Sequence, residues 1–281
     1  MNLIGSYNCA LVALSVLIAI IASYAALDLA ARVTAANGRV RAVWLVGGAV
    51  AMGTGIWSMH YIGMLAYVLP IPVAYHWPTV LFSLLAAVLA SAVALYVVSR
   101  DKMRAIQALA GSALMGAGIA GMHYIGMDAM RLQAMCHYNS VLVILSIVLA
   151  VLISFIALWI TFHFRDHTVG IDWHRIAGAI AMGAAIPVMH YTGMAAARFT
   201  PSPMPIDLSH VVSISTVGTV GIAAVSLIVL GLALLTSWVD RRFGRTNSGI
   251  APQQRTVPPA VRAQPRGRVP HHARRCNPRL Q

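Results

Sequence analysis

The chain has 281 residues, of which 59% are hydrophobic and 10% are charged, and its formal net charge is +13. A soluble globular domain carries about 25% charged residues, so this composition excludes an ordinary soluble protein and predicts a membrane protein. A strongly positive charge also fits nucleic-acid binding. Here the Lys and Arg residues are distributed according to membrane sidedness instead, and we expect no nucleic-acid partner.

Seven apolar segments follow one another along the chain, and each is long enough to cross about 30 Å of hydrocarbon. They are predicted at residues 9–31, 43–69, 79–99, 105–127, 141–162, 175–197 and 212–238. The expected fold class is therefore all-α: a polytopic membrane protein with seven transmembrane helices, surrounded by the lipid bilayer.

The positive charges divide the connecting segments into two classes. Of the 20 Lys and Arg residues, only Arg131 and Arg198 lie in the segments that follow spans 2, 4 and 6. Because positively charged segments stay in the cytoplasm, the pattern predicts an outside N-terminus and a cytoplasmic C-terminus. No signal peptide is evident, since no positive segment precedes the first span. Cys9 and Cys136 lie on the predicted outer side, and two cysteines alone do not establish a disulfide.

Two regions of different composition are expected. Residues 1–240 would form one seven-span membrane domain. Residues 241–281 are rich in Pro, Arg and Gln and poor in apolar side chains, so we expect a disordered, basic cytoplasmic tail. Such a tail fits either a solvated end or a segment that binds anionic lipid or a protein partner.

One phrase occurs three times, as MGTGIWSMHYIGM at residues 52–64, MGAGIAGMHYIGM at 115–127 and MGAAIPVMHYTGM at 182–194. Each copy lies in an even-numbered span, and the preceding span carries a weaker Ser-x-x-Ala-Leu echo. The repeating unit is therefore a pair of spans, which predicts three parallel two-helix repeats plus one extra helix. A pseudo-threefold axis along the membrane normal would bring the three even-numbered spans together.

The histidines of the three copies are His60, His123 and His190, and they are predicted to share one depth near the outer face. An ionisable residue within a span is costly and marks a candidate functional site, whereas hydrogen bonding between helices is the structural alternative. Three histidines with matching neighbours favour a shared site.

Methionines lie at fixed positions around each histidine. Their angles about the helix axis follow from a rotation of about 100° per residue. One lies about 40° from the histidine and one turn outward: Met64, Met127 and Met194. Another precedes the histidine directly and lies about 100° away: Met59, Met122 and Met189. A third lies about 80° away and two turns inward: Met52, Met115 and Met182. Each repeat therefore offers one imidazole and one or two thioethers to an interior point.

Imidazole and thioether groups form a soft ligand set that suits copper, especially Cu(I). Carboxylates, which oxygen-seeking metals need, are nearly absent from the predicted outer side. Two alternatives to a copper-binding sensor stay open. A copper-handling transporter would need ligands at more than one depth, and a haem protein would use two of the histidines as axial ligands. No nucleophile elbow, phosphate loop or acid pair is present, so we expect no enzymatic activity.

These residues resemble the MHYT family of bacterial integral membrane sensor domains, over roughly residues 5–240. The resemblance implies a signalling protein of the bacterial inner membrane that binds copper near the outer face and responds to oxygen, carbon monoxide or nitric oxide. By the family's pattern, the metal ligands would be the adjacent pairs Met59–His60, Met122–His123 and Met189–His190. Helical geometry favours Met64, Met127 and Met194 as the sulfur ligands instead.

Two departures from the family's pattern are visible. The threonine of the family's name is present only as Thr192, because the other copies have Ile62 and Ile125. A hydroxyl at this place is therefore not required in every copy. Family members are often fused to cyclic-di-GMP enzymes, histidine kinases or DNA-binding modules, whereas no output domain follows residue 240 here. The resemblance then implies action through a separate cytoplasmic signalling partner.

Overall fold

The structure is a computed structural model, and it describes residues 3–100, 102, 104–164, 173–202, 209–213 and 216–248. Residues 1–241 form one compact unit and residues 242–281 form a second. Within the second unit only residues 242–248 are described, as helical turns. The rest of the predicted disordered tail lies outside the described residues.

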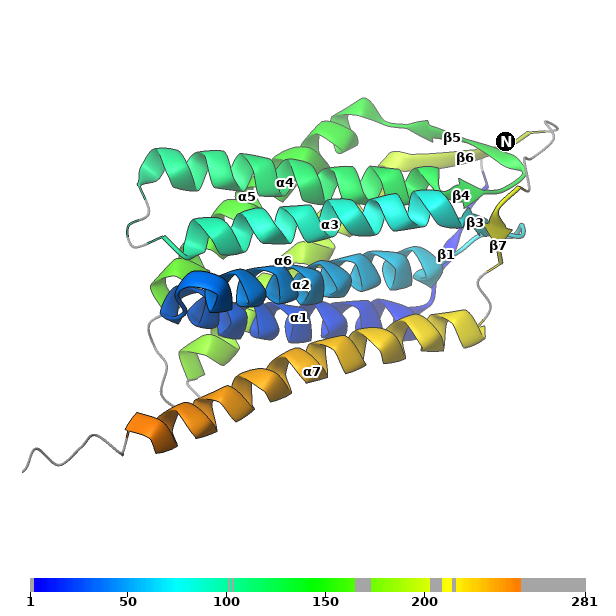
Figure 1. The fold of residues 1–281 in the computed structure, drawn as a ribbon. Coiled ribbons are helices and arrows are strands. Elements are labelled where there is room, and N and C mark those ends of the chain that lie inside the picture. Colours follow the sequence, from blue (N-terminus) through cyan, green and yellow to red (C-terminus); the bar gives the residue numbers. More distant parts are fainter. Residues whose placement is uncertain are drawn as a thin grey trace, which may run out of the picture. The chain divides into compact units, whose positions relative to one another are not determined.

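Seven helices make up most of the described chain (Figure 1). They are α1 (Cys9–Ala35), α2 (Gly38–Ala66), α3 (Trp77–Val98), α4 (Ala105–Asp128), α5 (Ser140–Phe164), α6 (Trp173–Ala196) and α7 (Thr216–Ser248). All seven are long and apolar enough to cross a membrane. The predicted all-α, seven-span fold class is therefore confirmed.

Short strands gather at one end of the helices, which we call the strand end (Figure 1). They are β1 (Ser6–Tyr7), β2 (Tyr67–Val68), β3 (Ala74–His76), β4 (Met130–Arg131), β5 (Ala134–Tyr138), β6 (Ala197–Pro201) and β7 (Val211–Val212). All pairs are antiparallel: β1 with β2, β3 with both β4 and β7, and β5 with β6. These strands link the three loops to one another and to the N-terminal segment.

The strands correct two predicted span boundaries. The predicted span 43–69 ends three residues too late, because the helix ends at Ala66 and Tyr67 pairs with Tyr7 of β1. The predicted span 212–238 begins too early, because Val212 pairs with Tyr75 of β3. Segments of two to five residues carry too little alternation to be recognised from hydropathy.

Helices α1 to α6 form a closed ring in which each helix packs on the next and α6 packs back on α1. The glycine that follows the first methionine of each phrase lets neighbouring repeats approach closely. A Cβ added to Gly53 would lie 2.7 Å from the Cα of Val88 in α3, and one added to Gly116 would lie 2.7 Å from the Cα of Val151 in α5. A Cβ at Gly183 would meet the backbone of Ile20 in α1, which closes the ring.

A buried ion pair also joins the third repeat to the first. Arg175 Nη2 of α6 lies 3.6 Å from Asp28 Oδ1 of α1, and both side chains are 2% exposed. At the positions that correspond to Asp28, the other two repeats have Tyr96 and Trp159. The charge pair is therefore specific to the place where the ring closes.

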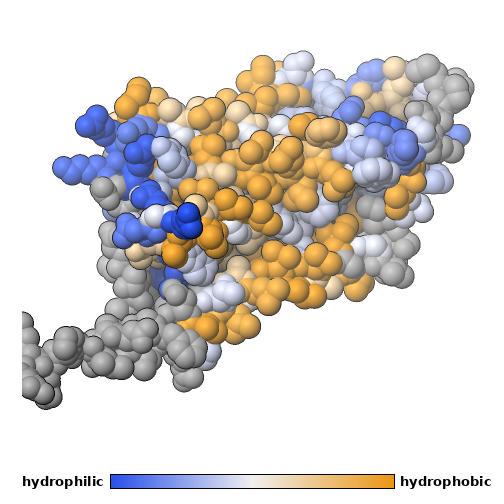
Figure 2. Space-filling model, viewed as in Figure 1, coloured by the Kyte–Doolittle hydropathy of each residue, from blue (hydrophilic) through white to orange (hydrophobic). Residues whose placement is uncertain are grey.

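Hydrophobic side chains cover the middle of the face shown in Figure 2, and hydrophilic side chains gather toward its two ends. Exposed apolar residues of this kind include Leu85, Leu89, Ile144 and Leu152. Such a belt is expected where lipid surrounds the helices. The protein is a multi-pass membrane protein. Its two described cysteines, Cys9 and Cys136, are exposed and are not bonded to each other.

Candidate metal centre

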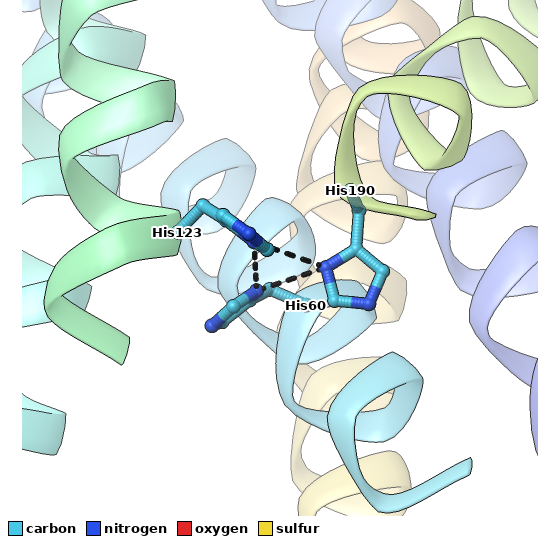
Figure 3. Close-up of side chains that lie close together, drawn as sticks. All are labelled: His60, His123 and His190. Atoms are coloured by element: carbon cyan, nitrogen blue, oxygen red, sulfur yellow. Dashed lines mark hydrogen bonds between the residues drawn. The ribbon is translucent and has the colours of Figure 1, made fainter. Parts of the chain in front are cut away.

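Three histidines from three different helices meet inside the ring (Figure 3). The Nδ1 atom of His60 in α2 lies 3.1 Å from that of His190 in α6 and 3.2 Å from that of His123 in α4. The Nδ1 atoms of His123 and His190 are 3.3 Å apart. All three side chains are fully buried. In the part of the chain that the structure describes, no other group of His, Cys, Asp or Glu brings three ligand atoms together like this triad.

No arrangement of protons satisfies this triangle of nitrogens. An imidazole nitrogen is a donor when it carries a proton and an acceptor when it does not. With one or two protons among the three Nδ1 atoms, two of the pairs can hydrogen-bond, but the third joins two donors or two acceptors. With none or three, every pair is repulsive. A cation among the nitrogens would meet all three lone pairs at once.

The dimensions of the triad also suit a small metal ion. A triangle with sides of 3.2 Å has its centre about 1.8 Å from each corner (3.2 Å divided by √3). Bonds between zinc and imidazole nitrogen measure about 2.0–2.1 Å. The residues present therefore fit a metal ion held by the three Nδ1 atoms, provided that each ring retreats slightly.

Each imidazole is held from behind by a glycine of the next copy of the phrase. A Cβ added to Gly126 would contact Nε2 of His60. In the same way, Gly193 lies against His123 and Gly63 lies against His190. The three Nε2 atoms are buried and have no hydrogen-bond partner among the described residues. These glycines fix which ring nitrogen faces inward, and the sequence alone does not reveal this because the histidine and its glycine belong to different copies of the phrase.

The structure brings one predicted set of methionines together and separates the other. Met64, Met127 and Met194 are buried in one cluster with Tyr61 and Phe199, one helical turn from the triad toward the strand end. The methionines that precede the histidines are also buried but belong to three separate clusters: Met59, Met122 and Met189. This arrangement follows the helical angles, which place the first set closer to the direction of the histidine.

The tyrosine after each histidine ties its helix to the next odd-numbered helix, or in α6 back to α1. The oxygen pairs are Tyr61–Ser83 at 3.5 Å, Tyr124–Ser146 at 2.6 Å and Tyr191–Ser15 at 3.0 Å. Each serine hydroxyl already donates to the carbonyl three residues earlier, at 2.7–2.8 Å. The tyrosine hydroxyl must therefore donate to the serine oxygen. These hydroxyls are engaged in joining helices, and the sequence does not identify their serine partners because the serines lie in the other spans.

Comparison with known sequences places these features in a family. The family described as "Bacterial signalling protein N terminal repeat", abbreviated MHYT, matches residues 1–43, 53–111, 116–171 and 183–246. These matches cover all seven helices in part and most of the chain. No solved structure matches the chain.

Several characterised signalling proteins are similar to the chain. The bifunctional diguanylate cyclase/cyclic di-GMP phosphodiesterase MucR of Pseudomonas aeruginosa is 44% identical over 249 residues, which cover 89% of this chain and 36% of MucR. The signaling protein YkoW of Bacillus subtilis is 37% identical over 247 residues, 87% of this chain and 31% of YkoW. The cyclic di-GMP phosphodiesterase NbdA of Pseudomonas aeruginosa is 36% identical over 205 residues, 72% of this chain and 26% of NbdA.

The chain thus spans about a third of the length of these relatives or less. The segments that match the family include His60, His123 and His190. The chain belongs to the MHYT family of bacterial signalling proteins.

Proposed function

We propose that the protein is a membrane-embedded sensor that binds copper at the triad of His60, His123 and His190 and responds to the metal or to a diatomic gas. The gas would be oxygen, carbon monoxide or nitric oxide. The observation that carries the proposal is the triangle of buried Nδ1 atoms, which no protonation state satisfies. Membership of a signalling family supports the sensory role.

The surrounding side chains favour copper over harder metals. The cluster next to the triad contributes the thioethers of Met64, Met127 and Met194. Thioether and imidazole ligands suit copper, whereas magnesium and calcium need oxygen ligands. When bound, copper would supply a Lewis-acidic centre with affinity for small diatomic molecules. The protein's own contribution is to exclude water and to hold three neutral imidazoles in contact.

The packing behind the triad provides a route by which binding of a metal or a gas would move the helices. Each imidazole lies between the other two rings and the backbone of a neighbouring helix, at Gly63, Gly126 or Gly193. A change in the size of the triangle therefore has to shift α2, α4 and α6 relative to one another, because a close-packed interior has no free volume to absorb the change. The ends of these helices away from the strands would transmit the shift to a separate cytoplasmic partner.

The two alternatives require different arrangements. Haem bound between two of the histidines would place a macrocycle where the Nδ1 atoms are now 3.1–3.3 Å apart, so the rings would have to separate. Copper transport would require metal to cross the bilayer. Measurement of copper uptake into proteoliposomes separates transport from sensing.

We further propose that the protein lies in the bacterial inner membrane with its strand end outside. The N-terminus would then be outside and the C-terminus cytoplasmic. The support is the charge pattern: at the opposite end, Arg41 lies in the first turn of α2 and Arg104 precedes α4, whereas the strand end has few cations.

Loss of bound copper on acidification tests directly whether the triad holds the metal. Protons compete with metal for imidazole but do not bind thioethers, so copper on the triad should be released between neutral and acidic pH. We expect purified protein loaded with Cu(I) at pH 7 to hold one equivalent that is lost at pH 4.5. The variant with alanine at His60, His123 and His190 should lack it, whereas His163→Ala, at an exposed helix end, should retain it. Equal acid-labile copper in all three proteins would refute the proposal.

The response to gas is measured on the same samples. Carbon monoxide should give an infrared band from the metal-bound gas in the copper-loaded protein and in His163→Ala. The triple alanine variant should show no such band. A band of equal intensity in the triple variant would mean that the gas binds elsewhere.

A further inference from the structure

A small interior cavity lies on the side of the triad away from the strand end. Its volume is about 30 Å³, and its lining includes Met52 of α2, Met115 of α4 and Met182 of α6. Each of these methionines lies eight residues before the histidine of its helix. At 1.5 Å per residue the cavity is therefore about 12 Å from the triad along the helices. The same three helices thus place methionine side chains around one interior space at a second depth.

Methionine often serves only as a flexible filler of gaps in cores. Here the cavity is not filled, although all three methionines line it and each is at most 7% exposed. The other lining residues are alanine, isoleucine and serine, with no carboxylate, imidazole or thiol. Any metal held here would have to be one that accepts thioethers, which are neutral, soft ligands.

Two serine hydroxyls give independent support for a ligand in the cavity. Ser23 and Ser154 line it, are 3% and 0% exposed, and have no partner for Oγ among the described residues. The matched serine of the middle repeat, Ser91, donates to the carbonyl of Ala87 at 2.8 Å and does not line the cavity. A helical serine normally satisfies its hydroxyl in this way. The two serines that face the cavity do not.

We propose that Met52, Met115 and Met182 form a second metal site, which binds a monovalent soft ion of the Cu(I) class. The cavity has room for a small species, since its volume of about 30 Å³ exceeds the roughly 10–15 Å³ that a water molecule needs. The hydroxyl oxygens of Ser23 and Ser154 would lie beside the ion. Met182 would exchange its weak 3.9 Å contact with the Thr161 hydroxyl for the metal.

The charge of the surroundings selects a monovalent ion. No charged side chain lines the cavity. Transfer of a divalent ion into such a site costs about four times as much Born energy as transfer of a monovalent ion, because the energy scales with the square of the charge. Two hydroxyls are also too few for sodium, calcium or magnesium, which need a fuller set of oxygen ligands. This site does not require the triad to be occupied.

Silver binding at two pH values tests the proposal, with Ag(I) as a redox-stable substitute for Cu(I). Because thioethers are not protonated, silver at the inner methionines should remain bound at pH 4.5, where imidazole-bound metal is released. We expect purified full-length protein to retain one acid-resistant equivalent. The triple alanine variant of the triad should retain it as well, so failure of the triad as a metal site would leave this result unchanged.

Matched variants assign the acid-resistant equivalent to its ligands. Leucine is close to methionine in volume, so Met52→Leu, Met115→Leu and Met182→Leu together should remove the equivalent with little change in packing. The control replaces the cavity's matched isoleucines, Ile56, Ile119 and Ile186, by leucine and should retain it. If the triple methionine variant does not fold, Met115→Leu alone should weaken silver affinity about tenfold or more, the order of effect for a disturbed metal shell.

Two results would overturn the proposal. One is acid-resistant silver that persists when the three inner methionines are leucine, which would leave water as the occupant of the cavity. The other is loss of that silver when Met64, Met127 and Met194 are replaced by leucine instead, since this would place the thioether site at the strand end of the triad.

Discussion

Replacement of Gly126 by alanine perturbs the triad without replacing a candidate ligand. The added Cβ would contact Nε2 of His60 and would lie 2.9 Å from its Cδ2 and 3.3 Å from its Cε1. Carbon atoms pack favourably only from about 3.5 Å, so the ring must retreat by roughly 0.5 Å or more. It has no room to do so, because its Nδ1 already lies 3.1 Å and 3.2 Å from the Nδ1 atoms of His190 and His123.

The expected magnitude follows from this overlap. An extra methyl group forced into a packed interior destabilises a protein by about 1–3 kcal/mol. We therefore expect Gly126→Ala to lower the free energy of unfolding by about 1–3 kcal/mol and to reduce acid-labile copper. The control is Gly121→Ala in the same helix, where an added Cβ meets nothing within 4 Å. A glycine-to-alanine change in a helix interior without a clash is neutral or stabilising by up to about 1 kcal/mol.

Thermal or denaturant unfolding of the purified variants in detergent, together with copper analysis, measures both effects. The same substitution in a protein that lacks the His60 ring separates the effect of the steric clash from other effects of the added methyl group. In His60→Ala the ring is absent, so adding Gly126→Ala should cost no further stability. The reasoning is refuted if Gly126→Ala is as stable as Gly121→Ala and binds copper normally, or if its cost is the same in the His60→Ala background.

Three further predictions concern other contacts. Tyr124→Phe should lower the free energy of unfolding by about 1 kcal/mol through loss of the 2.6 Å hydrogen bond to Ser146, and a double-mutant cycle with Ser146→Ala that shows no coupling would contradict this. Asp28→Leu should cost about 3–5 kcal/mol because the guanidinium of Arg175 stays charged and buried, and adding Arg175→Met should restore most of the loss; a double variant no more stable than the single would count against the pair. Partial burial raises the pKa of the Cys136 thiol, so less of it is thiolate at neutral pH; its labelling in intact cells by an impermeant maleimide should be slow at pH 7 and faster as the pH rises, whereas labelling only after permeabilisation would reverse the proposed orientation.

Much of the architecture could be predicted from local patterns. Long apolar segments define the helices because a helix that crosses lipid must satisfy its own backbone and present apolar side chains. The repeated phrase placed His60, His123 and His190 at one depth, since equal positions in parallel repeats lie at equal heights. The strands were missed because their pairing, such as Tyr75 with Val212, depends on contacts between segments far apart in the chain.

The tertiary structure decided what the histidines present to one another. The angles within one helix indicate which methionine lies on the same side as the histidine. The rotation of each helix about its own axis, however, is set by contacts with its neighbours. Glycine at 63, 126 and 193 allows a neighbouring imidazole to press its Nε2 edge against the backbone, which leaves Nδ1 facing the centre. Sequence by itself determined which residues share a depth, because depth depends on position along one helix. Their convergence into a triangle depends on three helices packed around one axis, which no single segment encodes.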